Sequence, residues 1–154
     1  MSSTDEIRKQ LHLKAPPSRV WRAITDAAEF GAWFRVKLES PFVAGQPSSG
    51  QIMYPGWEHV RFTLVVEAIE PEARFAYRWH PYAVDIDKDY SAEPMTLVEF
   101  LLEPQDGGTL VTVVESGFDR LPPERIAEAF RMNERGWAEQ LVNIGTHIGA
   151  DAGA

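Results

Sequence analysis

The carboxylate best placed to do chemistry is Glu115, which follows Val111 and Val113 at alternate positions of an apolar stretch. Alternate residues of a strand share a face, so these three side chains are expected to point the same way. A carboxylate beside apolar groups is costly to keep charged, and burial raises its pKa. Such a group could act as a general acid or base, or anchor the polar end of a ligand. In the other interpretation, Glu115 lies at the solvated end of the strand and pairs with Arg131 or Arg135.

A second polar residue, Asn133, stands where apolar residues are expected. It falls between Phe130 and Trp137, in a segment whose apolar residues recur every three, four or seven positions, as on one face of a helix. Its amide could hydrogen-bond a polar group of a ligand. It could equally bond a strand backbone or Glu115, and the sequence favours neither.

Aromatic residues gather at alternate positions of the predicted strands. Phe75, Tyr77 and Trp79 share one face of one strand, and Phe62 and Phe100 are expected to face them from others. Aromatic walls with a few polar groups are typical of small-molecule cavities. The alternative is that these rings fill the core. We favour a cavity, because one helix cannot fill a strongly curved sheet.

The mouth of such a cavity could be lined by Trp33, Phe34, Met53 and Trp57. The full set of predicted ligand-binding residues is Trp33, Phe34, Phe62, Phe75, Tyr77, Trp79, Phe100, Glu115, Phe130, Asn133 and Trp137.

Other chemistries lack their motifs. The four histidines have no metal-binding spacing, and no nucleophile-elbow, P-loop or dinucleotide motif occurs. Asp85, Asp87 and Asp89 resemble the start of a calcium loop, but Tyr90 stands where that loop requires glycine and Thr96 where it requires glutamate. We therefore predict no metal and no cofactor.

Composition narrows the classes of partner. The 154 residues carry a net charge of −8 and form no basic stripe, which argues against nucleic acid. There is no cysteine, no signal peptide and no apolar run long enough to span a membrane, so we expect a cytoplasmic protein.

The elements that must position these residues can be read from periodicity. Apolar residues alternate around Ile7–Leu13, as in a strand, and two short helices follow, the second beginning at Asp26 with Glu29 in capping-box spacing. Period-two alternation then covers segments at 36–38, 52–54, 59–69, 74–80, 96–103 and 109–117, with a hairpin turn at Gly107–Gly108. An apolar helical stripe over Pro122–Ile148 ends the chain. We therefore expect one α+β domain over residues 1–154, in which an antiparallel sheet curls around the last helix.

Two further expectations concern the other face of the sheet. His80 has the opposite parity to Trp79 and should face solvent or a loop rather than the cavity. An outward apolar patch would mark a homodimer interface or be covered by the irregular segment Pro81–Pro94. The patch consists of Leu97, Leu101, Leu110 and Val114.

Several short motifs, in this order and spacing, resemble the family of homologues of the activator of heat-shock-protein-90 ATPase, within the START-related, birch-pollen-allergen-like superfamily. They are Val20-Trp21, Ile24-Thr25-Asp26, Trp33-Phe34, Gly108-Thr109, Glu115-Ser116-Gly117-Phe118 and Gly136-Trp137. The resemblance spans about Ile7 to Ile148. It implies a helix-grip fold, in which a curved antiparallel sheet of six to seven strands wraps a long C-terminal helix beside a hydrophobic cavity. It also places Val111 and Val113 in the core, and hence Glu115 inward.

The resemblance does not imply one activity, because family members bind lipids, hormones and polyketides, act as cyclases, or assist a chaperone. The eukaryotic activator has an additional N-terminal domain, whereas this chain begins with the first strand, which argues against the chaperone role. We expect binding of a small apolar or aromatic molecule. The alternatives are a cyclase or hydro-lyase that uses Glu115, with Asn133 or Tyr77 orienting substrate, and a co-chaperone.

Overall fold

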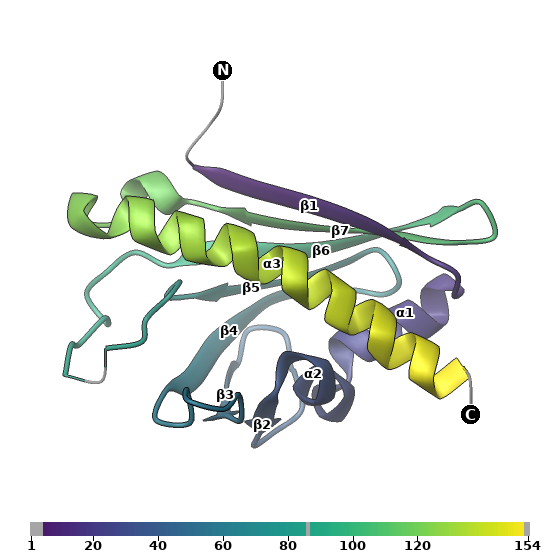
Figure 1. The fold of residues 1–154 in the computed structure, drawn as a ribbon, viewed down its shortest axis with the longest axis horizontal. Helices are drawn as coiled ribbons and strands as arrows, with labels where there is room; N and C mark the ends of the chain where they lie inside the picture. Colours follow the sequence, from purple (N-terminus) through teal and green to yellow (C-terminus); the bar gives the residue numbers. More distant parts are fainter. Residues whose placement is uncertain (1–4, 86, 153–154) are drawn as a thin grey trace.

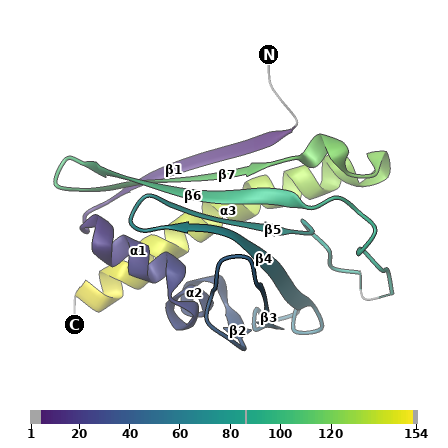
Figure 2. The same cartoon turned by 180° about the vertical axis from the view of Figure 1, so that it is seen from behind.

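Seven strands form one antiparallel sheet that curves around a long helix (Figure 1 and Figure 2). The computed structural model describes residues 5–85 and 87–152. The strands are β1 (Glu6–Leu13), β2 (Val36–Leu38), β3 (Pro47–Ile52), β4 (Arg61–Glu70), β5 (Arg74–Trp79), β6 (Thr96–Gln105) and β7 (Gly108–Ser116). Their order across the sheet is β1-β7-β6-β5-β4-β3-β2. Strands β2 to β7 therefore form a meander, and β1 joins its far side by pairing with β7.

The last helix, α3 (Pro123–Ala152), lies diagonally across one face of the sheet (Figure 1). The predicted apolar stripe is confirmed, because Trp137, Leu141, Ile144 and Ile148 are buried against the sheet and the short helices. Burial of these side chains stabilises a helix far more than intrinsic propensity does. The helix-grip fold and its α+β class are confirmed.

The two short helices are α1 (Pro17–Thr25) and α2 (Ala27–Phe34), and a 3₁₀ turn (Phe118–Arg120) precedes α3. As predicted, Asp26 caps α2: its carboxylate accepts hydrogen bonds from the backbone N–H groups of Ala28 and Glu29 at 2.9 and 3.1 Å. The reciprocal half of the capping box does not form. The Glu29 carboxylate instead binds Arg19, Arg22 and His147, which ties α1 and α2 to α3.

The sheet departs from the predicted pattern in two places. Strand β3 begins at Pro47, ahead of the predicted segment 52–54, and ends at Ile52, before Tyr54. Gly50 permits the close pairing of β3 with β2, because a Cβ atom at this position would lie only 2.3 Å from the Lys37 carbonyl oxygen. In β4 the register shifts at Glu67, which bulges between Val66 and Ala68. Before the bulge the even-numbered residues of β4 face the core, and beyond it the odd-numbered residues do. Ile69 therefore lies opposite Phe75.

The hairpin between β6 and β7 turns at Asp106 and Gly107, which both have positive φ. The predicted turn is thus shifted by one residue. On the outer face, Val114 is buried and the leucines are half-buried. The Arg74 guanidinium bonds the Glu99 carboxylate there at 2.7 Å. The segment Pro81–Pro94 makes its described polar contacts with α3 rather than with this face. Within the described residues, no helix is long and apolar enough to cross a membrane.

Candidate functional site

Glu115 lies fully buried in β7, under the middle of α3. Four side chains donate hydrogen bonds to its carboxyl group. Trp79 Nε1 and Thr96 Oγ1 reach Oε2 at 2.7 and 2.6 Å, and Trp137 Nε1 and Asn133 Nδ2 reach Oε1 at 2.8 and 2.9 Å. The inward orientation of Glu115 is therefore confirmed. The predicted pairing with Arg131 or Arg135 is wrong.

All four donors around Glu115 are neutral. Burial raises the pKa of Glu115, and the four hydrogen bonds, which favour the charged form, oppose this shift. The two indole N–H groups can only donate, so each carboxyl oxygen must accept at least one hydrogen bond. The four donors bond to both oxygens of the carboxyl group. Glu115 therefore holds the side chains of Trp79, Asn133 and Trp137 in place.

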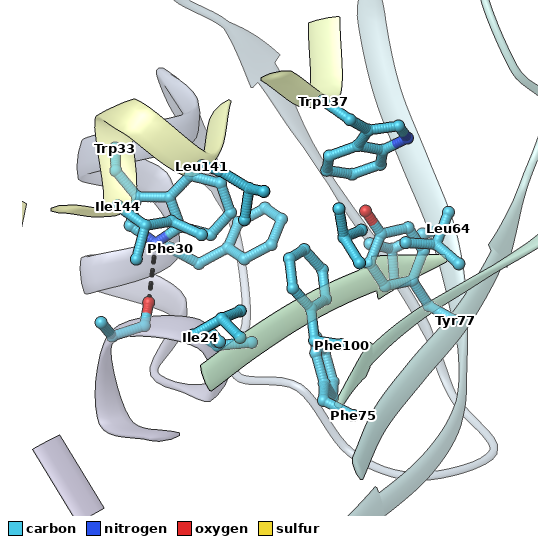
Figure 3. Close-up of a cluster of buried hydrophobic side chains, with 14 of the residues drawn as sticks. Ile24, Phe30, Trp33, Leu64, Phe75, Tyr77, Phe100, Trp137, Leu141 and Ile144 are labelled. Atoms are coloured by element: carbon cyan, nitrogen blue, oxygen red, sulfur yellow. Dashed lines mark hydrogen bonds between the residues drawn. The ribbon is translucent and has the colours of Figure 1, made fainter. Parts of the chain in front are cut away.

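The aromatic interior beneath α3 is filled by its own rings (Figure 3). Phe30 of α2 lies at its centre, with ring centroids 4.6 Å from Trp33, 5.0 Å from Phe34 and 6.4 Å from Tyr77. Phe100 packs edge-on against Trp137 at 5.7 Å. Edge-to-face and offset pairs of this kind are the favourable arrangements of aromatic rings. The deep core that the sequence suggested as a cavity is thus closely packed at these positions.

An open cleft lies beside this packed interior, between the middle of α3, the β3–β4 end of the sheet and the segment after β5. We define it by three adjoining hollows of about 350, 290 and 130 Å³. All three are lined by Phe34 of α2, and Trp79, Asn133 and Trp137 form the end nearest Glu115. The remaining apolar and aromatic lining consists of Ile52, Tyr54, Trp57, Val60, Phe62, Tyr82, Ala83, Val84 and Tyr90.

The predicted site residues divide into three groups. Phe34, Phe62, Trp79, Asn133 and Trp137 line the cleft, which the structure thereby brings together from α2, β4, β5 and α3. The second group is buried in the interior behind it and consists of Trp33, Phe75, Tyr77, Phe100 and Glu115.

Phe130 forms the third group, because it packs against Phe118 near the start of α3. Of the other two predicted mouth residues, Trp57 lines the cleft and Met53 is 53% exposed outside it. Sequence reasoning missed Tyr82 and Val84, which lie in a segment without periodicity, and Gln140, one helical turn beyond Trp137.

Asn133 serves a structural purpose and also borders the cleft. Its bond to Glu115 matches the structural interpretation offered by the sequence. Its exposed side lines two of the three hollows, so the ligand-contact interpretation stays a prediction.

The segment that closes one side of the cleft is anchored by Arg125 in the first turns of α3. Its guanidinium donates to the backbone carbonyls of Pro81 and Tyr82 at 3.0 and 3.1 Å, and pairs with Glu93 at 2.9 Å. Lys88 also pairs with Glu93, at 3.1 Å. Burial alone would raise the pKa of Glu93, but the hydrogen bonds from Arg125 and Lys88 lower it below the usual value.

We expect this anchor to weaken in acid. Because the folded pKa of Glu93 is lowered, its contribution is present above the unfolded pKa and is lost as pH falls through the folded pKa. Glu93→Gln should therefore reduce stability at neutral pH by about 1–2 kcal/mol, and the difference from the native chain should vanish in acid. Urea unfolding at a series of pH values measures it. The same change at exposed Glu128 serves as the control, and a difference for Glu93→Gln that grows in acid would contradict the expectation.

Tyr77 carries a buried polar group without a partner. Its hydroxyl forms no hydrogen bond within the described structure, and burial, followed by the nearby charge of Glu115, raises the pKa of this phenol well above its usual value. An unpaired buried hydroxyl is costly, so Tyr77→Phe should raise the free energy of unfolding by about 1 kcal/mol or more. Thermal melting measures this change. A fall of similar size in the free energy of unfolding would show that the Tyr77 hydroxyl has a hydrogen-bond partner.

A larger groove of about 810 Å³ lies elsewhere, between α2, β2 and residues 39–42. Its lining includes the charged residues Asp26, Lys37 and Glu39, small side chains of α2, and a single aromatic residue, Phe42. It lacks the ring-lined walls that favour apolar ligands, so we regard the cleft at Trp79 as the candidate site. Within residues 5–85 and 87–152, no three histidine, aspartate or glutamate side chains gather as they would around a metal ion.

A curved sheet gripping a C-terminal helix, with an aromatic cleft between them, defines a helix-grip protein. The chain belongs to the family described as Activator of Hsp90 ATPase homolog 1-like protein, whose model matches residues 14–149. No curated protein matches the chain.

Solved structures share this fold at low sequence identity. Protein MLL2253 from Mesorhizobium loti is 21% identical with a TM-score of 0.74, and the alignment covers 94% of this chain and 97% of that one. The Aha1 dimer from Colwellia psychrerythraea is 17% identical, with a TM-score of 0.68 and coverage of 93% and 95%. DynU16, from the dynemicin biosynthetic locus, is 23% identical with a TM-score of 0.72. There the match covers 94% of this chain but only 47% of DynU16, so this chain spans about half of that protein.

Proposed function

We propose that this protein binds a small apolar or aromatic molecule in the cleft beside Trp79. The observation that carries the proposal is the aromatic wall of the cleft. The side chains of Phe34, Trp57 and Trp79 line its hollows, whereas the ring of Phe30 behind Phe34 is packed in the interior. Exposed apolar surface gathered in a concavity is what such ligands require. The family supports the proposal because its fold commonly binds hydrophobic ligands.

The apolar area is sufficient for measurable affinity. At about 25 cal/mol per Å², a ligand that buries about 250 Å² of apolar surface gains about 6 kcal/mol, before the entropy of its immobilisation is subtracted. Few polar contacts would then bring the dissociation constant into the micromolar range.

The geometry argues against Glu115 as an acid or base in a cyclase or hydro-lyase. Glu115 is fully buried, and the residues that line the cleft do not include it. Its two oxygens accept four hydrogen bonds, so proton transfer to a ligand would first require Trp79 or Trp137 to move away. A positioning role for Glu115 needs no such movement.

Equilibrium dialysis with naphthalene tests the proposal. The native chain should bind it saturably, and Val60→Trp, which fills the cleft, should weaken binding at least tenfold. Val142→Trp is the matched control, because Val142 is exposed on α3 outside the cleft and the change should leave binding intact. Equal binding by both variants, or none by the native chain, would refute the proposal. Native mass spectrometry of protein purified from its own cells would then identify a retained ligand.

The family description supplies a second candidate function, stimulation of the Hsp90 ATPase. An ATPase assay separates the two functions: a co-chaperone would stimulate the chaperone without a ligand and would tolerate Val60→Trp.

A homodimer through the outer sheet face also remains a proposal, supported by the relative that is a dimer. Sedimentation equilibrium tests it, with Leu97→Glu as the disrupting variant.

A further inference from the structure

We propose that the ligand carries a hydrogen-bond donor, such as a phenolic hydroxyl, whose proton Asn133 Oδ1 accepts at the inner end of the cleft, with His80 Nδ1 as a second acceptor on the same hollow. This inference rests on the proposed function and names the chemical class that the cleft selects. Both residues line the same hollow of about 350 Å³, one from α3 and one directly after β5.

The orientation of the Asn133 amide follows from Glu115. Because the carboxyl oxygen accepts, the group that faces it at 2.9 Å must be the NH₂ group, so Oδ1 is the atom left for the cleft. Protonation of Glu115 does not reverse the orientation of the Asn133 amide. The short contact with Thr96 Oγ1, at 2.6 Å, provides an acceptor for that proton, since a hydroxyl can both donate and accept. Within the described chain, Oδ1 has no hydrogen-bond partner.

The imidazole of His80 is oriented by the segment that closes the cleft. Its Nε2 lies 3.1 Å from the backbone carbonyl oxygen of Glu93, which can only accept, so Nε2 carries the proton. In the neutral ring Nδ1 is then an acceptor. The bond agrees with the prediction that His80 faces a loop. The prediction that it faces away from the cavity is wrong, because His80 also lines the hollow of about 350 Å³.

The donors that line the same hollow are the hydroxyls of Thr63, Tyr82 and Tyr90 and the guanidinium of Arg61, and none of them is bonded to Asn133 or His80 in the described structure. The indole N–H groups of Trp79 and Trp137 are both used by Glu115, so their rings present only faces and edges to a ligand. The Arg61 guanidinium, which lines the same hollow, donates one of its N–H groups to Glu39 at 2.6 Å, and that carboxylate offsets its charge. An aromatic ring against Trp79, with a hydroxyl turned toward Asn133, therefore satisfies this end of the cleft. An anion is disfavoured there, because it would meet two acceptors next to buried Glu115.

Four related probes test this inference by equilibrium dialysis at neutral pH: a naphthol, the corresponding methoxynaphthalene, methylnaphthalene and naphthoate. The naphthol should bind about three- to tenfold more tightly than the methoxy compound, which is what one net hydrogen bond contributes. Naphthoate should bind most weakly. Equal affinity for the naphthol and the methoxy compound, or tightest binding of naphthoate, would overturn the inference while leaving the proposed function intact. Failure of all four to bind would overturn the proposed function itself.

Variants locate the acceptor. Asn133→Leu should reduce the preference for the naphthol over the methoxy compound toward one. The matched change Asn143→Leu, on the same helix and outside the cleft, should keep it. Circular dichroism establishes that each variant is folded. If Asn133→Leu does not fold, His80→Phe takes its place and should reduce the preference about two- to threefold. An unchanged preference in a folded Asn133→Leu, or in His80→Phe, would contradict the assignment of that acceptor.

Discussion

Replacing Glu115 with glutamine is expected to lower the free energy of unfolding by about 2–4 kcal/mol. A glutamine has one acceptor oxygen and one NH₂ group in place of two acceptor oxygens. If the oxygen faces Trp137 and Asn133, the NH₂ group faces Trp79 and Thr96. Turning the amide over exchanges the two pairs. Thr96 or Asn133 can rotate to accept, but an indole N–H cannot, so one tryptophan always loses its partner.

Thermal melting measures the loss. For a chain of this size each kcal/mol shifts the melting temperature by about 2–4 °C, so we expect a fall of about 5–15 °C. Glu103→Gln, at an exposed position of β6, should leave the melting temperature nearly unchanged. The indole N–H resonances of Trp79 and Trp137 supply a second readout: in the variant one of them should exchange faster with water. A variant as stable as the native chain would show that Glu115 does not hold these tryptophans.

Replacing Phe30 with alanine should have a still larger effect, a loss of about 3–5 kcal/mol. Phe30 is fully buried and its ring contacts five other aromatic rings, among them Phe42 at 5.3 Å and Phe62 at 6.2 Å. Removing it takes away the transfer energy of the ring and leaves a void that packed neighbours cannot close. Urea unfolding measures the loss. The control is Phe130→Ala, because that ring is only partly buried and the expected loss is less than half as large.

The void in Phe30→Ala provides a further measurement. An apolar void walled by aromatic rings should accept benzene, which would raise the melting temperature of the variant by mass action and leave the native chain unaffected. A loss below about 1.5 kcal/mol, with no response to benzene, would mean that the interior collapses around the missing ring. The interior would then be too plastic for the walls of the cleft to be fixed, which would weaken the case for a preformed site.

Phe30 and Glu115 both support the aromatic side chains that line the cleft. Phe30 supports the ring of Phe34 from the interior, at 5.0 Å, and Glu115 fixes Trp79 and Trp137. Together they hold the aromatic surfaces that a ligand would contact. We therefore expect ligand affinity to fall in both variants, although neither residue lines the cleft.

The sequence by itself determined the architecture, but for Glu115 it left two interpretations open, an inward position and the solvated end of the strand. Period-two alternation located β4 to β7, period 3.6 located α3, and family resemblance placed Val111 and Val113 in the core. These features are local: a strand alternates its faces and a helix repeats its stripe wherever the chain goes. The same reasoning failed where local rules were interrupted. The Glu67 bulge reversed the parity of β4. Strand β3 lies ahead of the predicted segment 52–54, where Gly50 allows the backbone of Lys37 to approach closely.

Only the tertiary structure decided what surrounds Glu115 and where space remains beside it. Its four donors come from positions 18 to 36 residues distant along the chain, on β5, β6 and α3. No spacing rule links residues that meet through the packing of a helix on a sheet. The sequence identified the aromatic residues, but whether their rings fill the interior or leave a hollow depends on the curvature of the sheet and the position of α2. Packing at that level depends on rotamers and backbone positions together, and periodicity carries no information about either.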